Sequence, residues 1–198
     1  MINLINLSLE IPYQLFKDKY DEALNAGQRN IEAISISSYN KEVAEVDSRY
    51  VNLKFIINDE FIFFSNYKSP KALSFKNHNQ IAVLLYWPSI NTQIRMKAKI
   101  KKTSIEFNQR YFFDRAREKN ALAISSNQSN RINSYNLVKE NYEKSLKNDD
   151  LKKYPKYWGG YSFSPYEIEF WEGNDFRLNK RNLYIKDNTS WNHFILEP

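Results

Sequence analysis

The sequence predicts a mainly β fold, in which antiparallel strands form a closed or nearly closed barrel and peripheral helices complete an α+β arrangement. Two observations lead to this expectation. After one amphipathic N-terminal helix, the spacing of apolar residues changes from a period of about 3.6 to a period of about 2. Further along, helical segments are inserted between predicted strands, without a linker or a repeat. A chain of 198 residues, 42% of them hydrophobic, can bury one core, so we expect a single domain over residues 1–198.

The first element is a helix over Pro12–Ala26, because proline suits the first helical turn and Gly27 is a plausible C-cap. The alternating segments that follow predict four strands, at Ile31–Ile36, Val43–Val46, Tyr50–Ile57 and Glu60–Ser65. Asn58-Asp59 forms the hairpin between the last two.

The second half begins with a short helix over Ser69–Lys76. It leads to Ile81–Trp87, whose almost continuous apolar run predicts a strand buried on both faces. In Thr92–Lys102 apolar residues alternate with cations, which predicts a strand with one solvated basic face. The remaining segments predict helices at Ser104–Arg117 and Ser134–Leu146, and strands at Tyr161–Trp171, Arg177–Ile185 and Ser190–Leu196.

The composition excludes several kinds of function. Without cysteine the chain has no disulfide, no iron–sulfur cluster and no cysteine nucleophile, and with two distant histidines we expect no metal site. Its four glycines form no phosphate-binding fingerprint, so side chains must hold any phosphorylated ligand. No apolar run approaches the roughly 20 residues of a membrane span, and the N-terminus lacks a secretory signal. We therefore expect a cytoplasmic protein that does not contact the membrane.

The charge balance is modestly basic. Lys+Arg number 29 against 23 Asp+Glu, a net charge of +6. This excess favours a solvated basic surface over nucleic-acid binding, and no aromatic segment with interleaved cations matches an RNA-binding strand, so we expect no nucleic-acid partner. Glu167 and Glu169 point to the same face of a predicted strand and are interpreted as a surface pair.

Two neighbouring segments carry side chains suited to a phosphate. Arg49 and Lys54 stand five residues apart on a predicted strand, so they project to opposite faces unless a bulge redirects one of them. The segment Phe63–Lys71 then supplies hydroxyls and a lysine at a predicted helix start. Such a helix start can hold a phosphate without glycines.

Taken in order, these segments and those that follow resemble the pyridoxine (pyridoxamine) 5'-phosphate oxidase family, FMN-dependent enzymes with an antiparallel split β-barrel. The similarity extends from about Pro12 to Pro198. Its most specific parts are Arg49–Lys54, Phe63–Lys71, Tyr86-Trp87 with Gln93, Tyr111–Arg115, Trp158–Tyr161, and Ile168–Gly173 followed by Arg177-Leu178 and Arg181. The resemblance implies a homodimer that binds the flavin at its interface, with residues from both chains.

The resemblance also implies a role for individual residues. Arg49 and Lys71 match positions that contact the FMN phosphate. The other implied flavin-binding residues are Tyr50, Val51, Lys54, Phe64, Ser65, Ser69, Gln93, Gln128, Ser129, Trp171 and Arg181. The positions that hold the substrate phosphate match Lys54, Tyr111 and Arg115, and Arg177 matches the arginine over the pyridine ring.

Several positions depart from the family pattern. Pro70 replaces a second phosphate-binding arginine, Lys119 replaces a serine that binds the substrate phosphate, and Asn179 replaces the histidine of the Arg-Leu-His motif. The basic N-terminal segment of the family is also missing from this sequence. We still expect Lys119 and Asn179 to contact the substrate, with Arg177 and Asn179 as the catalytic residues on one face of a strand.

The activity that the resemblance implies is the oxidation of pyridoxamine or pyridoxine 5'-phosphate to pyridoxal 5'-phosphate, a reaction of pyridoxine biosynthesis, with O2 reduced to H2O2. Two alternatives stay open: an FMN-dependent oxidoreductase acting on another ring, as in phenazine-forming relatives, and a non-catalytic binder of flavin or pyridoxal phosphate. The departures on the substrate side favour the alternatives, whereas Lys54, Tyr111, Arg115 and Arg177 together favour the oxidase. The preference between amine and alcohol, the turnover and any second pyridoxal phosphate site stay open.

Overall fold

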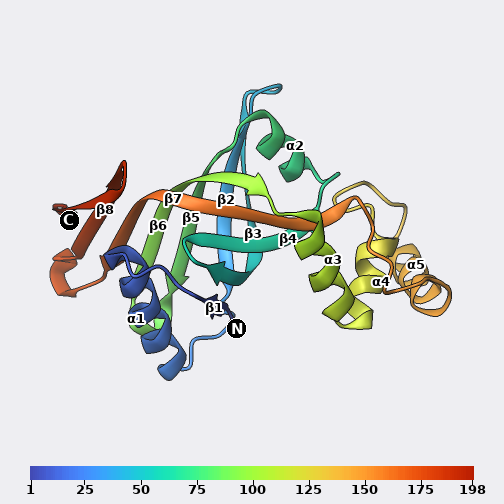
Figure 1. Ribbon diagram of the computed structural model, residues 1–198, viewed down its shortest axis with the longest axis horizontal. Coiled ribbons are helices and arrows are strands. Elements are labelled where there is room, and N and C mark those ends of the chain that lie inside the picture. The colour runs from blue at the N-terminus through green and yellow to red at the C-terminus, as the bar shows by residue number, and fades with distance from the viewer.

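The computed structural model, which describes residues 1–198, is built on a closed antiparallel barrel (Figure 1). Six strands pair in a ring, in the order β2, β3, β4, β7, β6 and β5, and β5 pairs back with β2. They are β2 (Ala33–Asn40), β3 (Glu45–Ile57), β4 (Glu60–Asn66), β5 (Gln80–Trp87), β6 (Thr92–Lys102) and β7 (Trp158–Glu172). The predicted mainly β fold, a split barrel with helices around it, is confirmed.

Strand β3 changes partners along its length. Residues 45–52 pair with β2, whereas the ladder to β4 begins at Leu53. Along residues 45–52 the second edge of β3 therefore has no strand partner, and this open edge borders the site described below. The two strands predicted at Val43–Val46 and Tyr50–Ile57 are this one long strand, because the residues between them continue the ladder to β2.

The core of the barrel is filled by apolar and aromatic side chains, and α1 (Ile11–Asn25) packs against it. Phe16 of this helix meets Phe61 and Trp87 edge-on, with ring centroids 5.3 and 5.7 Å apart. These three side chains are almost completely buried, so the helix is held by its apolar face. The predicted helix over Pro12–Ala26 is confirmed within one residue at each end.

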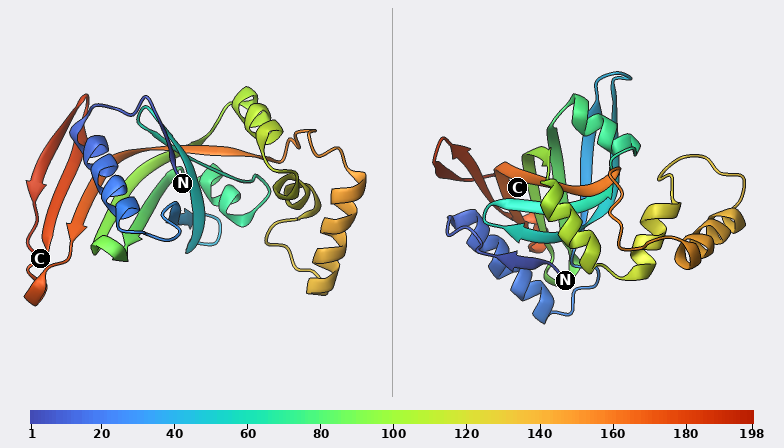
Figure 2. Two further views of the ribbon diagram at one scale, coloured as in Figure 1. Left: turned by 90° about the horizontal axis from the view of Figure 1, so that it is seen from below. Right: turned by 45° about the vertical axis from the view of Figure 1, so that its right-hand side comes forward.

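Four more helices follow: α2 (Pro70–Asn77), α3 (Ile105–Asp114), α4 (Arg117–Ser125) and α5 (Tyr135–Asn148). The last three lie towards one end of the molecule, whereas α2 lies beside β2 (Figures 1 and 2). Ser104 and Ser134 cap α3 and α5 through their hydroxyls, which explains where these helices begin. The sequence did not predict α4, and the helix expected over Ser104–Arg117 ends at Asp114, because Arg115 and Ala116 adopt extended backbone conformations. None of the helices combines the length and the apolar composition needed to cross a membrane.

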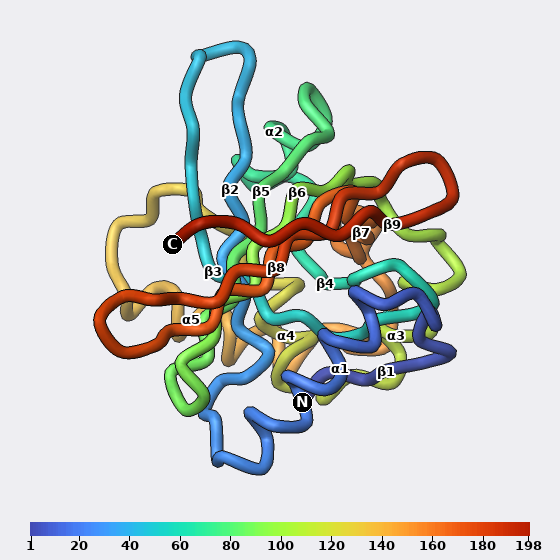
Figure 3. Tube along the Cα trace, turned by 90° about the vertical axis from the view of Figure 1, so that its left-hand side faces the viewer, coloured from blue at the N-terminus to red at the C-terminus, as the bar shows by residue number.

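The C-terminal strands extend the sheet at the opposite end, where β8 (Lys180–Asp187) pairs with β7 and β9 (Ser190–Ile195) with β8 (Figures 1 and 3). A short strand that was not predicted, β1 (Asn3–Ile5), lies parallel to the end of β3.

The prediction that Ile81–Trp87 is buried on both faces is wrong. Burial alternates along β5, and its outward side chains include Leu84 and Tyr86, which are 40% and 51% exposed. The reason is that β5 is an antiparallel strand of a barrel wall, with one face in the core and the other outside.

Candidate functional site

A pocket of about 550 Å³ opens beside the unpaired edge of β3. Its walls come from β3, the end of β4, the start of α2, the α3–α4 junction, the loop after α4 and the first residue of β7. The lining residues are Asp47, Arg49, Tyr50, Val51, Asn52, Lys54, Phe64, Ser65, Pro70, Lys71, Tyr111, Arg115, Lys119, Gln128, Ser129 and Trp158. Many residues predicted for one site are thus brought together by six separate segments.

The sequence left open whether Arg49 and Lys54 project to opposite faces of the strand or whether a bulge redirects one of them, and the structure contains the bulge. The register between β3 and β4 shifts between Leu53 and Phe55, so Lys54 is the extra residue. Arg49 and Lys54 consequently line the same pocket although they stand five residues apart.

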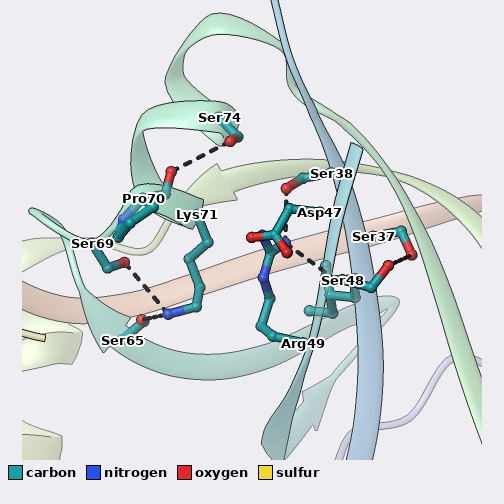
Figure 4. Close-up of polar contacts among 11 residues, drawn as sticks. Ser37, Ser38, Asp47, Ser48, Arg49, Ser65, Ser69, Pro70, Lys71 and Ser74 are labelled. Atoms are coloured by element: carbon teal, nitrogen blue, oxygen red, sulfur yellow. Dashed lines mark hydrogen bonds and ion pairs between the residues drawn. The ribbon is translucent and has the colours of Figure 1, made fainter. Parts of the chain in front are cut away.

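At one end of the pocket, Lys71 is a buried cation without an acidic partner (Figure 4). Its side chain comes from the first turn of α2, and its Nζ donates to Ser65 Oγ at 3.3 Å and to Ser69 Oγ at 3.5 Å. Ser69 is completely buried behind it. Burial lowers the pKa of Lys71, and the neighbouring charge of Arg49 lowers it further. A desolvated ammonium group held only by hydroxyls is suited to an anionic ligand.

Arg49 stands across from Lys71 and is anchored to the barrel wall. Its Nη1 donates to Ser38 Oγ at 2.8 Å and to the carbonyl of Ile36 at 3.3 Å, both on β2. Its Nη2 forms an ion pair with Asp47, two residues earlier on β3 (Figure 4). The guanidinium is therefore fixed at the pocket wall before any ligand arrives.

The other end of the pocket gathers three more cations, Lys54, Arg115 and Lys119. The guanidinium of Arg115 lies 4.5 Å from the centre of the Trp158 ring, and its buried Nη1 has no hydrogen-bond partner. Burial lowers the pKa of both Arg115 and Lys54, and the charges of Lys119 and Arg115 lower that of Lys54 further, against the opposing effect of Glu32. An unpartnered donor among three cations also indicates an anion site.

Aromatic rings form the wall between the two ends. Phe64 stacks on Tyr111 with centroids 3.9 Å apart, and on Trp158 with centroids 5.1 Å apart. Burial raises the pKa of the Tyr111 hydroxyl, although the charge of Arg115 opposes the rise. Tyr111 therefore stays protonated at neutral pH and can donate to an anion.

Gln128 fastens the loop after α4 to the end of β4. Its Oε1 accepts hydrogen bonds from the Asn66 amide at 3.2 Å and from Ser65 Oγ at 3.5 Å. Ser129, which follows it at φ +70°, also lines the pocket.

A second group of predicted residues lies elsewhere. Gln93, Trp171 and Arg181 occupy directly paired positions on β6, β7 and β8, so they form a row on one face of the sheet. Along β7, Trp158 and Trp171 are separated by about 40 Å, at about 3.3 Å per residue. The row therefore lies at the opposite end of β7 from Trp158.

Glu169 contacts Arg181 of this row, which the sequence did not predict. Its carboxylate accepts from Arg181 Nε at 2.7 Å and pairs with Arg95 Nη1 at 3.0 Å. It is 6% exposed, so the interpretation of Glu167 and Glu169 as a surface pair is wrong for Glu169. The two arginines come from neighbouring strands, which is why the carboxylate can be buried.

Arg177 and Asn179 do not lie on a strand, contrary to prediction. Arg177 is exposed, with φ +62°, at the end of a short 3-10 turn, and β8 begins only at Lys180. Asn179 Oδ1 accepts from the Asn174 amide at 3.2 Å, so it closes the loop between β7 and β8. The alternation that predicted a shared face breaks down because this loop turns, and both residues lie beside the row rather than in the pocket.

The fold and the pocket define the class: a split β-barrel with a cation-lined pocket on its side. Residues 158–198 match the family model described as the pyridoxine 5'-phosphate oxidase C-terminal dimerisation region. The pyridoxine/pyridoxamine 5'-phosphate oxidase of Leptospira biflexa is 34% identical over 189 residues, covering 94% of this chain and 89% of that protein. Its counterpart in Legionella pneumophila (strain Paris) is 35% identical over 194 residues, covering 94% and 87%. The chain therefore belongs to the pyridoxine/pyridoxamine 5'-phosphate oxidase family, and the predicted resemblance is confirmed.

Solved structures agree on the fold. PhzG from Burkholderia lata 383, in complex with tetrahydrophenazine-1-carboxylic acid, superimposes with a TM-score of 0.89 at 24% identity, covering 94% of this chain and 92% of that one. A pyridoxamine 5'-phosphate oxidase-related, FMN-binding protein from Nostoc punctiforme gives a TM-score of 0.76 at 12% identity, covering 92% and 97%. At these identities the likeness shows the split-barrel fold.

Proposed function

We propose that this protein is an FMN-dependent oxidase that converts pyridoxamine or pyridoxine 5'-phosphate to pyridoxal 5'-phosphate and reduces O2 to H2O2. Relatives with this name at 34% and 35% identity support the proposal. The observation that carries it is the pair of separate cation groups in one pocket, because such a reaction must hold the phosphate of a cofactor and the phosphate of a substrate side by side.

The residues at the first end fit the phosphate of FMN. Lys71 is a buried ammonium group without a counter-ion, and Ser65 and Ser69 add hydroxyls beside it. Arg49 offers a planar fork, which suits phosphate oxygens better than a lysine does. When bound, FMN supplies the acceptor for the hydrogen equivalents that leave the substrate.

At the second end, Lys54, Arg115 and Tyr111 are proposed to hold the substrate phosphate, and Lys119 adds a cation at the rim. The stacked rings of Phe64, Tyr111 and Trp158 exclude water from this wall and keep Arg115 in place. The contribution of these side chains is orientation, since transfer from the substrate requires a near-attack geometry.

We further propose that the working unit is a homodimer. Trp171, which pairs with Gln93 and Arg181, lies about 40 Å along β7 from Trp158, at about 3.3 Å per residue. Neither these three residues nor Arg177 lines the pocket of the same chain. A second copy can bring its own row to the pocket, and the match of residues 158–198 to a dimerisation region supports this arrangement.

The test is an anaerobic titration of the purified protein. We expect a bound flavin whose absorbance band bleaches when pyridoxamine 5'-phosphate is added and returns with oxygen, with one H2O2 formed per substrate. Pyridoxamine without phosphate should bleach it far less, because Lys54 and Arg115 then have no anion to bind. A flavin that never bleaches would indicate a non-catalytic binder. Bleaching only by tetrahydrophenazine-1-carboxylic acid would indicate the alternative ring substrate.

A further inference from the structure

We propose that Asp47 is an internal counter-ion that competes with the ligand phosphate for Arg49, and so lowers the preference of the pocket for phosphorylated over neutral flavin. This inference rests on the proposed function, because it assigns this end of the pocket to the phosphate of FMN. It adds an inhibitory residue to a site whose other members attract the anion.

The geometry places Asp47 in direct competition. Asp47 and Arg49 are two residues apart on β3, so both side chains project from the same face of the strand. The Asp47 carboxylate pairs with Nη2 of Arg49, while Nη1 is already bound to β2 (Figure 4). A phosphate that approaches Arg49 from the pocket therefore meets a guanidinium whose donors are largely occupied.

The charges at the two ends of the pocket differ. Asp47 is the only acidic residue that lines it. The end beside Asp47 has two cations, Arg49 and Lys71, against this one carboxylate. Pro70 next to them brings neither a charge nor a backbone N–H. The other end has three lining cations, and Glu32, which does not line the pocket, pairs with one of them, Lys54, at 3.9 Å. A phosphate monoester carries close to two negative charges. The net positive charge at the end proposed for FMN is therefore too small to balance the phosphate.

The pair is built so that it can open. The side chain of Asp47 is 68% exposed, whereas that of Arg49 is 16% exposed. Asp47 can rotate into water at little cost, while Arg49 stays anchored to Ser38 and Ile36. FMN can therefore bind, but each binding event separates the ion pair and leaves a carboxylate near the phosphate. Riboflavin, which has no phosphate, does not need to separate it.

The experiment compares Asp47→Asn with the wild-type protein stripped of ligand. FMN and riboflavin are each titrated, and the quenching of flavin fluorescence gives the Kd. We expect Asp47→Asn to bind FMN about tenfold more tightly, because the carboxylate that pairs with Arg49 and opposes the charge of the phosphate is removed. The Kd for riboflavin should not change. Glu45→Gln is the matched control, since this exposed carboxylate lies on the same strand face outside the pocket, and it should change neither constant.

The possible results separate the inference from the proposed function. Equal FMN affinity in wild type and Asp47→Asn, or weaker binding by the variant, would overturn the inference and leave the cofactor assignment intact. A gain that Glu45→Gln shares would also overturn it, because net charge alone would then be responsible. If neither wild type nor Asp47→Asn binds FMN, the cofactor assignment fails together with the inference. An unchanged melting temperature of the Asp47→Asn protein shows that the fold is preserved.

Discussion

Lys71 couples ligand binding to stability at the scale of a single residue. Its ammonium group is desolvated and near Arg49, so its pKa in the folded protein lies below the usual 10.5. A lysine with a depressed folded pKa costs stability at every pH below that pKa. The cost disappears as the pH rises through the depressed value towards 10.5, because the unfolded state then loses its proton as well.

We therefore expect Lys71→Met to stabilise the ligand-free protein while it weakens FMN binding. The melting temperature should rise by about 2–4 °C near neutral pH, as for a gain of roughly 1 kcal/mol in a chain of this size. The difference from wild type should shrink as the pH approaches 10.5. Lys76→Met, an exposed lysine on the same helix, is the control and should give no such rise. A lower melting temperature for Lys71→Met at neutral pH would show that the buried charge is already compensated.

Lys119 tests the second end of the pocket. It lines the rim from α4, and its backbone carbonyl accepts from Arg115 Nη2 at 3.3 Å. Lys119→Ala should raise the KM for the phosphorylated substrate several-fold and leave the flavin content unchanged, because only the substrate end loses a cation. Steady-state kinetics measure this, with the exposed Lys139→Ala on α5 as control. An unchanged KM would mean that the Lys119 ammonium group points to solvent.

It is easier to predict from the sequence which cations bind a ligand than which carboxylates pair with those cations. Arg49, Lys54, Lys71 and Arg115 were predicted because their residue types and spacing matched a family, and the pocket brings them together. Asp47 was not predicted, and Glu169 was interpreted as a surface residue. Their importance depends on which arginine stands beside them, and that follows from strand register and side-chain direction, which local periodicity does not contain.

At the scale of elements, most strands and helices were predictable because their apolar residues recur with a period that matches one buried face. The errors occur where tertiary contacts decide. The strand β1 is three residues long and exists only by pairing with β3, and α4 begins after a two-residue extended break. The turn that contains Arg177 interrupts a pattern that otherwise resembles a strand.

The start of β7 provides the element-scale prediction. Gly159 pairs with Ser65 of β4, and a Cβ added to Gly159 would overlap the Tyr67 hydroxyl and the Asn108 side chain. These groups belong to one buried network, in which Asn108 Nδ2 donates to the Tyr67 hydroxyl at 3.1 Å and the Tyr67 hydroxyl donates to the Gly160 carbonyl at 3.0 Å.

Gly159→Ala should therefore destabilise the protein by about 1–3 kcal/mol, as expected for overpacking. It should also disturb the neighbouring Trp158 and thereby weaken substrate binding. Gly27→Ala is the comparison, because a Cβ there meets open space and only the φ of +71° opposes it. Thermal unfolding with a flavin titration measures both effects. Equal stability of Gly159→Ala and wild type would show that the network yields without cost.

For the whole molecule, the closed ring links strands that lie as far apart in the sequence as β2 and β7. This supports our proposal that residues 1–198 form one domain. The same ring separates the pocket from the row of Gln93, Trp171 and Arg181, which β7 carries to its far end. Periodicity did not predict this separation, since it depends on the length and direction of a single strand. If both sets contact one flavin, our proposed dimer assigns them to different chains.

Mixed dimers test this arrangement. Arg49→Ala removes a pocket residue and Arg181→Ala a row residue, so each variant alone should bind little FMN. After equal amounts are unfolded and refolded together, half of the dimers are mixed, and each mixed dimer has one site with both residues intact. The mixture should therefore recover about a quarter of the FMN sites of wild type.

A matched mixture of wild type with the double variant Arg49→Ala/Arg181→Ala distinguishes the two possible geometries. If each site combines two chains, every site of a mixed dimer carries one lesion, and only the wild-type dimers bind, which again gives about a quarter of the sites. If each site belongs to one chain, every wild-type chain keeps its own site, which gives about half. Bound FMN per chain after gel filtration measures the fraction. A result of one half here, with no recovery in the first mixture, would overturn the shared site.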